Sequence, residues 1–136
     1  MREKRVHTGR ISSRAVKDKG TCMEFELVLS FTKIVITTEF LGEDILITLK
    51  GGDKPHIGTA VLSVPRPSLT GDGSISATSS VLNVTGHKDE TICRILAEKA
   101  AKKYGVTAVC IGGFHMDGIS AGQIREVAAA VQNFDV

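Results

Sequence analysis

Three of the four histidines lie in short glycine-containing segments, where the sequence best supports binding or catalysis. His56 lies in GGDKPHIGT, His87 in TGHKDE and His115 in GGFHMDG. Glycine permits positive φ angles and close backbone approach, so such turns suit special geometry or a ligand. Each of these histidines follows a predicted strand or begins a predicted helix, so we expect the three to meet at one rim of a sheet. Capping of a local turn is the alternative explanation for each one.

The segment TGHKDE also begins a predicted helix, whose first backbone N–H groups have no partner within the helix. Such an end attracts anions, and His87 and Lys88 add two donors, so a phosphate or carboxylate site is predicted here. Asp89 and Glu90 place negative charge in the same turn. The helix dipole can therefore also be satisfied without a ligand, and both interpretations stay open.

Acidic side chains accompany two of the histidines and suggest two further kinds of chemistry. An aspartate and a histidine in one rigid loop can form an oriented acid–base pair. Two histidines and two carboxylates can instead hold a divalent metal. The residues of this possible set are Asp53, His56, His115 and Asp117. A metal-dependent enzyme is thus an alternative function, although we expect neither a metal nor a catalytic residue.

Several common catalytic and cofactor motifs are missing from the sequence. It contains no GxxxxGK[ST] loop, no GxGxxG turn and no GxSxG elbow, so nucleotide hydrolysis, a Rossmann cofactor site and serine hydrolysis find no support. Arg66 lies between Pro65 and Pro67, a rigid setting that suits a planar donor for phosphate or carboxylate. A solvent-exposed arginine in a stiff loop is the competing interpretation.

The pattern of apolar residues predicts an α+β domain. Runs rich in β-branched residues predict strands over 23–31, 33–41, 45–50, 57–64 and 74–84. Apolar residues at three- and four-residue spacing predict a helix over 88–104, ended by Gly105. A buried strand follows over 106–111, and Ser120 begins a last helix. We therefore expect a mainly antiparallel sheet of about six strands, with two helices on one face.

Composition and charge exclude several classes of protein. With 136 residues, 42% of them hydrophobic and 24% charged, the chain fits one globular domain. Residues 1–21 form a basic arm before a single domain over 22–136, but aromatic residues are only 4%, so nucleic-acid binding is not expected. No segment resembles a membrane span or a secretory signal, which places the protein in the cytoplasm. Three cysteines without CxxC spacing predict reduced, packed thiols.

Three segments together resemble a known family. GGDKPHIGTAVLSVPRPSL, SVLNVTGHKDE and GGFHMDGISAGQI, within about residues 45–130, are similar to the prenylated-flavin chaperone LpdD-like family, which includes an accessory subunit of gallate decarboxylase. The resemblance implies a fold like that of the proteasome assembly chaperones, small α+β domains that pair into dimers. It also implies a non-catalytic helper that binds prenylated FMN, FMN or a related flavin phosphate and assists its delivery to a UbiD-like decarboxylase.

Carried onto this sequence, the resemblance implies a cofactor site. We expect a glycine-rich first wall, a phosphate-binding helix end and a second wall from the GGFHMDG segment. In that order the residues are Gly51, Gly52, Asp53, His56 and Gly58, then His87 and Lys88, then Gly113, His115 and Asp117. From its rigid setting between prolines, Arg66 is expected as a further anion donor. Phe114 would be the aromatic group, with aliphatic support from Ile57 and Met116. A homodimer or higher homo-oligomer is expected. A protein-assembly chaperone without a small ligand stays open as an alternative.

Overall fold

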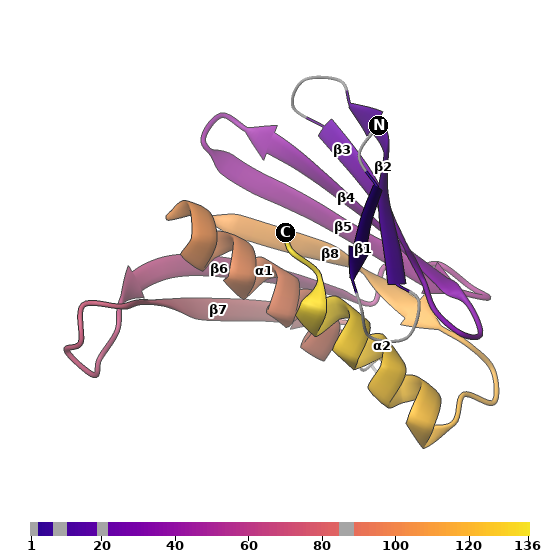
Figure 1. Cartoon of the computed structure of the whole chain (residues 1–136). Coiled ribbons are helices and arrows are strands. Elements are labelled where there is room, and N and C mark those ends of the chain that lie inside the picture. Colours follow the sequence, from indigo (N-terminus) through magenta and orange to yellow (C-terminus); the bar gives the residue numbers. More distant parts are fainter. Residues whose placement is uncertain (1–2, 7–10, 19–21, 85–88) are drawn as a thin grey trace.

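A single sheet of eight strands carries two helices on one of its faces (Figure 1). The computed structural model describes residues 3–6, 11–18, 22–84 and 89–136. The strands are β1 (Glu3–Val6), β2 (Ile11–Asp18), β3 (Cys22–Val28), β4 (Lys33–Leu41), β5 (Asp44–Gly52), β6 (Thr59–Pro67), β7 (Ile75–Asn83) and β8 (Ala108–His115). The helices are α1 (Glu90–Tyr104) and α2 (Ala121–Asn133). The strand order is β1-β2-β3-β4-β5-β8-β6-β7.

The last strand of the chain, β8, lies between β5 and β6 and pairs with them in opposite senses. β5 and β8 run parallel, with Ile45 opposite Ala108 and Gly52 opposite His115, whereas β6 and β8 run antiparallel. The other neighbouring strands pair antiparallel. Because β5 and β8 are parallel, their carboxyl ends meet at the same edge of the sheet. That edge holds two of the three histidine segments.

One face of the sheet forms the core with the helices. Alternate residues of the central strands point to this face, as the period of two in a strand requires. The fully buried side chains there include Leu27, Ile34, Ile36, Ile47, Leu49, Val61 and Cys110 from the strands, and Cys93 and Leu96 from α1. Burial raises the pKa of the Cys110 thiol well above its ordinary value, so this cysteine stays protonated and unreactive.

Both helices end or begin where the sequence predicts. Gly105 closes α1 in the left-handed conformation, with φ of 65°, and its N–H donates to the Ala101 carbonyl. Ser120 opens α2 with a capping box, because its side chain accepts from the Gln123 N–H while the Gln123 side chain accepts from the Ser120 N–H.

The end of the chain joins the two helices to each other and to the sheet. After α2, Phe134 packs edge-on against Phe25 of β3, with ring centroids 5.2 Å apart. Lys103 of α1 donates to the Asp135 carboxylate over 2.9 Å and to the Val136 carbonyl over 2.7 Å. Lys99 donates to the Phe134 carbonyl over 2.8 Å. The position of α2 beside α1 is thus set from its carboxyl end.

A second attachment of α2 joins its Glu126 to Ser30, in the turn between β3 and β4. Glu126 accepts from the Ser30 N–H over 2.7 Å and from the Ser30 hydroxyl over 2.6 Å. These bonds favour the charged form and hold the pKa of Glu126 below its ordinary 4.5.

Glu126→Gln is therefore expected to lower the free energy of unfolding slightly at neutral pH, by about 0.5 kcal/mol, because water screens this exposed contact. A group with a lowered pKa in the folded state stabilises above its unfolded pKa and loses that contribution as pH falls through the folded value. The difference between wild type and variant should therefore shrink below about pH 4.5. Urea unfolding from pH 7 to pH 3 measures it. A difference independent of pH, or one shared by the exposed Glu43→Gln, would contradict this assignment.

The fold class predicted from the sequence is confirmed, and two details differ. Two of the eight strands, β1 and β2, lie in the basic segment 1–21, where charged and polar residues interrupt the apolar alternation that marks a strand. β6 continues through Pro65 to Pro67. It pairs with β8 only as far as Ser63, so these prolines lie where β6 has no neighbour on that side. Within the described ranges, no helix has the length and apolar character needed to cross a membrane.

Candidate functional site

Two of the glycine-marked histidines meet at the carboxyl ends of β5 and β8. His56 lies in the loop between β5 and β6, and His115 is the last residue of β8. Their rings lie with centroids 6.3 Å apart at an angle of 77°. The His115 carbonyl also accepts from the Asp53 N–H over 2.8 Å, which ties the loop to the end of β8. The third histidine, His87, and its neighbour Lys88 lie outside the described residues.

Asp89, the residue before α1, connects the loop, β8 and the helix. The residue is only 6% exposed, and its side chain forms no capping hydrogen bond on its own helix. One carboxylate oxygen accepts from the Phe114 N–H of β8 over 2.8 Å, and the other lies 3.1 Å from His56 Nε2. His56 Nδ1 lies 2.9 Å from the Lys54 carbonyl oxygen. Both ring nitrogens of His56 thus face an oxygen atom, so the ring bridges the backbone of its own loop and the buried Asp89 carboxylate.

Two of the predicted glycines leave the space that the His56–Asp89 pair occupies. A Cβ at Gly58 would lie 2.1 Å from Asp89 Oδ2. A Cβ at Gly113 would lie 2.8 Å from His56 Nε2. Both distances are shorter than atoms can approach without bonding, so any other residue would displace the pair. These glycines are thus required for close packing beneath the site.

Gly51 and Gly52 place the end of β5 against the end of β8. A Cβ at Gly51 would lie 2.8 Å from a ring carbon of Phe114, so this glycine makes room for the aromatic ring. Gly52 has φ of 79° and backs onto the His115 carbonyl, where a side chain would be both strained and blocked. The two glycines allow the loop to turn directly over β8.

A second ion-pair group lies at the solvent side of the same loop. His115 Nε2 is 2.9 Å from Asp117 Oδ1, and Lys54 Nζ is 3.6 Å from Asp117 Oδ2. The hydrogen bond from His115, with the charge of Lys54 nearby, lowers the pKa of Asp117. Asp117 therefore stays ionised and holds two nitrogen donors at the edge of the site.

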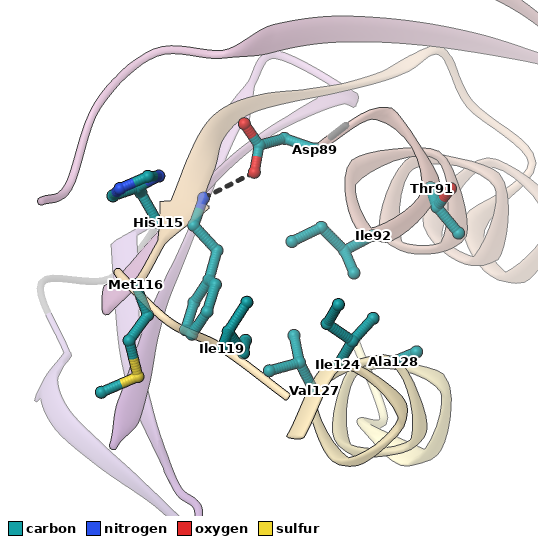
Figure 2. Close-up of a pocket in the computed structure, with 10 residues that line it drawn as sticks. Asp89, Thr91, Ile92, His115, Met116, Ile119, Ile124, Val127 and Ala128 are labelled. Carbon is teal, nitrogen blue, oxygen red and sulfur yellow. Dashed lines mark hydrogen bonds between the residues drawn. The ribbon is translucent and has the colours of Figure 1, made fainter. Parts of the chain in front are cut away.

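A pocket of about 490 Å³ opens beside these groups, between the end of β8, the start of α1 and α2. Figure 2 shows Ile92, Ile119, Ile124 and Val127 converging on it from α1, the β8–α2 loop and α2. The full lining is Asp89, Thr91, Ile92, Phe114, His115, Met116, Ile119, Ile124, Val127 and Ala128. The wall is mainly aliphatic, with Asp89, Thr91 and His115 as polar members. This size and composition are typical of a small-molecule site.

Arg66 is not brought to this site. It lies at the far end of β6, where its Nε donates to Thr78 Oγ1 over 2.8 Å and its guanidinium donates to the Pro67 carbonyl over 3.1 Å. Thr59, at the other end of β6, pairs with Gly112 next to the site. Thr59 and Arg66 are seven positions apart along an extended strand, a distance of roughly 23 Å. Ile57, expected as an aliphatic wall, is 68% exposed and does not line the pocket.

Asp89 and most of the apolar wall were not predicted from the sequence. The sequence indicates only a negative charge in the first helical turn for Asp89, whereas its carboxylate reaches across to β8. The apolar stripe of α2, which includes Ile124 and Val127, is the sequence signal that points to the wall. Ile124 is half exposed because this part of the stripe faces the pocket and not the core. As for the possible metal set, the described part of the chain contains no group of three or more His, Cys, Asp or Glu that could hold an ion.

Comparison with known families identifies the chain. The family model described as the prenylated flavin chaperone LpdD-like domain matches residues 30–134. The chain belongs to this family. The matched LpdD-like region begins after β3 and includes the β5–β6 loop, the His56–Asp89 pair and the whole pocket. No curated protein matches the chain.

Proposed function

We propose that this LpdD-like protein binds prenylated FMN, or a related flavin phosphate, and assists its delivery to a UbiD-like decarboxylase. Decarboxylation itself belongs to the partner, and this chain contributes no catalytic residue. The observation that supports the proposal is the apolar pocket of about 490 Å³ with nitrogen donors at its edge, in a chain whose family is named for this ligand.

The pocket wall suits the hydrocarbon-rich part of a prenylated flavin. Ile92, Ile119, Ile124 and Val127 offer an aliphatic surface, and Phe114 offers one aromatic ring. Burial of apolar surface contributes about 25 cal/mol per Å², so the added prenyl carbons increase affinity without needing a hydrogen bond. The thioether of Met116 adds a polarizable contact for a ring system.

The edge of the pocket suits the phosphate end. His115 lines the pocket. Lys54 lies near His115, because both residues contact the Asp117 carboxylate. A phosphate would attract both nitrogen groups by charge and hydrogen bonding. Asp117 orients them but would also repel the anion, so we assign it a positioning role rather than a ligand contact.

Six more of the predicted residues would act by shaping this edge. Gly51, Gly52, Gly58 and Gly113 allow the close approach of the loop, β8 and Asp89. Asp53 joins the loop to β8 through its N–H. The His56–Asp89 pair fixes the loop against the start of α1, so we place His56 behind the ligand surface. A homodimer or higher homo-oligomer is part of the same proposal.

Titration with three flavins tests the proposal. We expect prenylated FMN to bind saturably. Isothermal titration calorimetry under anaerobic conditions measures this binding. FMN, which lacks the prenyl carbons, should bind at least about tenfold more weakly, because each buried CH₂ is worth about 0.8 kcal/mol. Riboflavin, which also lacks the phosphate, should bind more weakly again. If none of the three binds saturably at about 100 µM, a concentration of the order of typical ligand dissociation constants, the proposal is wrong.

A matched pair of variants locates the phosphate end. Lys54→Ala should reduce the preference for FMN over riboflavin, while Lys50→Ala, on the neighbouring strand β5, should leave it unchanged. The ratio of the two affinities is the informative quantity, because it cancels any general effect on the pocket. An equal ratio in both variants would remove Lys54 from the phosphate site.

A further inference from the structure

We infer that the outer edge of β7 is an interface on which a second copy of this chain adds its own β7 in antiparallel register. β7 is the last strand in the sheet order, opposite the β1 end. It is nine residues long and pairs with β6 along its whole length, from Thr59 opposite Asn83 to Pro67 opposite Ile75, without a bulge. The edge is therefore long and regular.

Natural sheet edges are normally protected by charges, prolines, bulges or short length. The β7 sequence ISATSSVLN has no charged residue and no proline. The opposite edge differs, since the β1 sequence EKRV is four residues long and has three charged residues. Among the described strands only β6 pairs with β7, and an unprotected edge of nine residues is a template for strand pairing, so a partner strand would cover it.

The backbone groups that would pair are identified by alternation along the strand. The Val84 N–H donates to the Gly58 carbonyl, which directs Val84 toward β6. Alternate residues of a strand send both backbone groups to the same side. Leu82 and Ser80 therefore also face β6, whereas the backbone groups of Val81, Ser79 and Ala77 face outward. Those outward groups recur at every second residue, in the pattern that an antiparallel partner strand requires.

A second copy is the occupant that this strand fits best. A two-fold axis through Ser79 opposes Ser79 to its own copy and Ala77 to Val81, which uses the whole strand in both partners. The small residues at the centre allow close approach, and strand pairing between identical uncharged segments brings no like charges together.

Apolar exposure and the neighbouring helix support the same occupant. Leu82 and Ile75, near the two ends of β7, are 78% and 51% exposed, and an added strand would cover part of both. Above β7, Glu98 of α1 accepts from the Ser79 hydroxyl over 2.8 Å. Arg94 forms ion pairs with Glu90 and Glu98 on the same helix. The surface of α1 near β7 therefore carries both positive and negative charge, which a second copy would also present.

Introducing a positive or a negative charge at Ser80 tests the interface. Ser80 is exposed, and in the inferred register the two copies of it are diagonal neighbours, about 7–8 Å apart. Ser80→Lys alone and Ser80→Glu alone should each dimerise about two- to fivefold more weakly through like-charge repulsion. An equal mixture of the two should dimerise more strongly than either variant alone. Sedimentation velocity measures the mass against the chain mass of 14.5 kDa.

Controls separate this interface from other ways of associating. Leu69→Lys adds the same charge in the β6–β7 loop and should leave the dimer intact. Thermal melts of all variants check that they fold. The inference is overturned if the wild-type chain is monomeric, or if the dimer dissociation constant is unchanged in both Ser80 variants. Binding to another protein's strand in place of self-association would likewise overturn it.

Cross-linking reports the register directly. Ser79→Cys, in a chain with Cys22→Ser, should form a disulfide-linked dimer under mild oxidation because the axis brings the two copies of position 79 together. The remaining cysteines, Cys93 and Cys110, are buried and should not react. The Cys22→Ser chain without the new cysteine is the control. An absence of cross-linked dimer at position 79 would reject this register.

Discussion

Ala128→Phe is expected to weaken binding of prenylated FMN by at least about 100-fold, equivalent to about 2.7 kcal/mol. Ala128 lines the pocket from α2 and is half buried there. A phenyl ring at this position would occupy the volume that we assign to the flavin. The fold should survive, because the ring enters a cavity rather than the close-packed core between α1 and the sheet.

The adjacent residue supplies a matched control for that variant. Ala129 is exposed, lies on the same helix and does not line the pocket. Ala129→Phe adds the same ring and the same change in helix propensity, so its flavin affinity should stay within about twofold of wild type. Calorimetric titration of both variants measures the contrast. Equal affinities in Ala128→Phe and Ala129→Phe would place the flavin elsewhere.

Asp89→Ala should cost about 2–4 kcal/mol in the free energy of unfolding, because it removes a buried carboxylate that two partly buried groups contact. The Phe114 N–H and His56 both lose the carboxylate that they contact at 2.8 Å and 3.1 Å. Urea unfolding measures the loss. The same substitution should also weaken flavin binding, since the loop and the start of α1 would no longer be held together.

Two further variants show whether the cost arises from the pair. Glu90→Ala removes a neighbouring carboxylate whose partner Arg94 is part of a solvent-accessible ion pair, so it should cost less than about 1 kcal/mol. His56→Ala combined with Asp89→Ala should cost less than the sum of the two single changes, as coupled residues do. If Asp89→Ala costs no more than Glu90→Ala, the buried contacts of Asp89 contribute little.

The sequence was sufficient for those elements whose signals are local. Gly105 and Ser120 mark helix ends through their own backbone and side-chain chemistry, so both helix limits could be predicted. The glycine segments around His56 and His115 also indicated a shared position, and the rings of these two residues do lie near each other. In each case the informative residues lie within a few positions of the feature that they specify.

Features that depend on distant pairing could not be predicted from the same signals. No local pattern says that β8 pairs in parallel with β5 and antiparallel with β6, because the partners lie far apart in the chain. Without that order, the rigid setting of Arg66 gave no indication that it lies at the opposite end of β6. The role of Asp89 was hidden for the same reason, since its partners come from β8 and the β5–β6 loop.

The placement of the pocket between helices and the end of a strand has a consequence for how a ligand would be released. Its walls consist of side chains and a connecting loop, and the ladder of strand pairs lies to one side. A ligand could therefore enter or leave the pocket without breaking the hydrogen bonds between the strands. Side-chain and loop motions of this kind take nanoseconds to microseconds, so release of a flavin bound as proposed would not require unfolding of the domain.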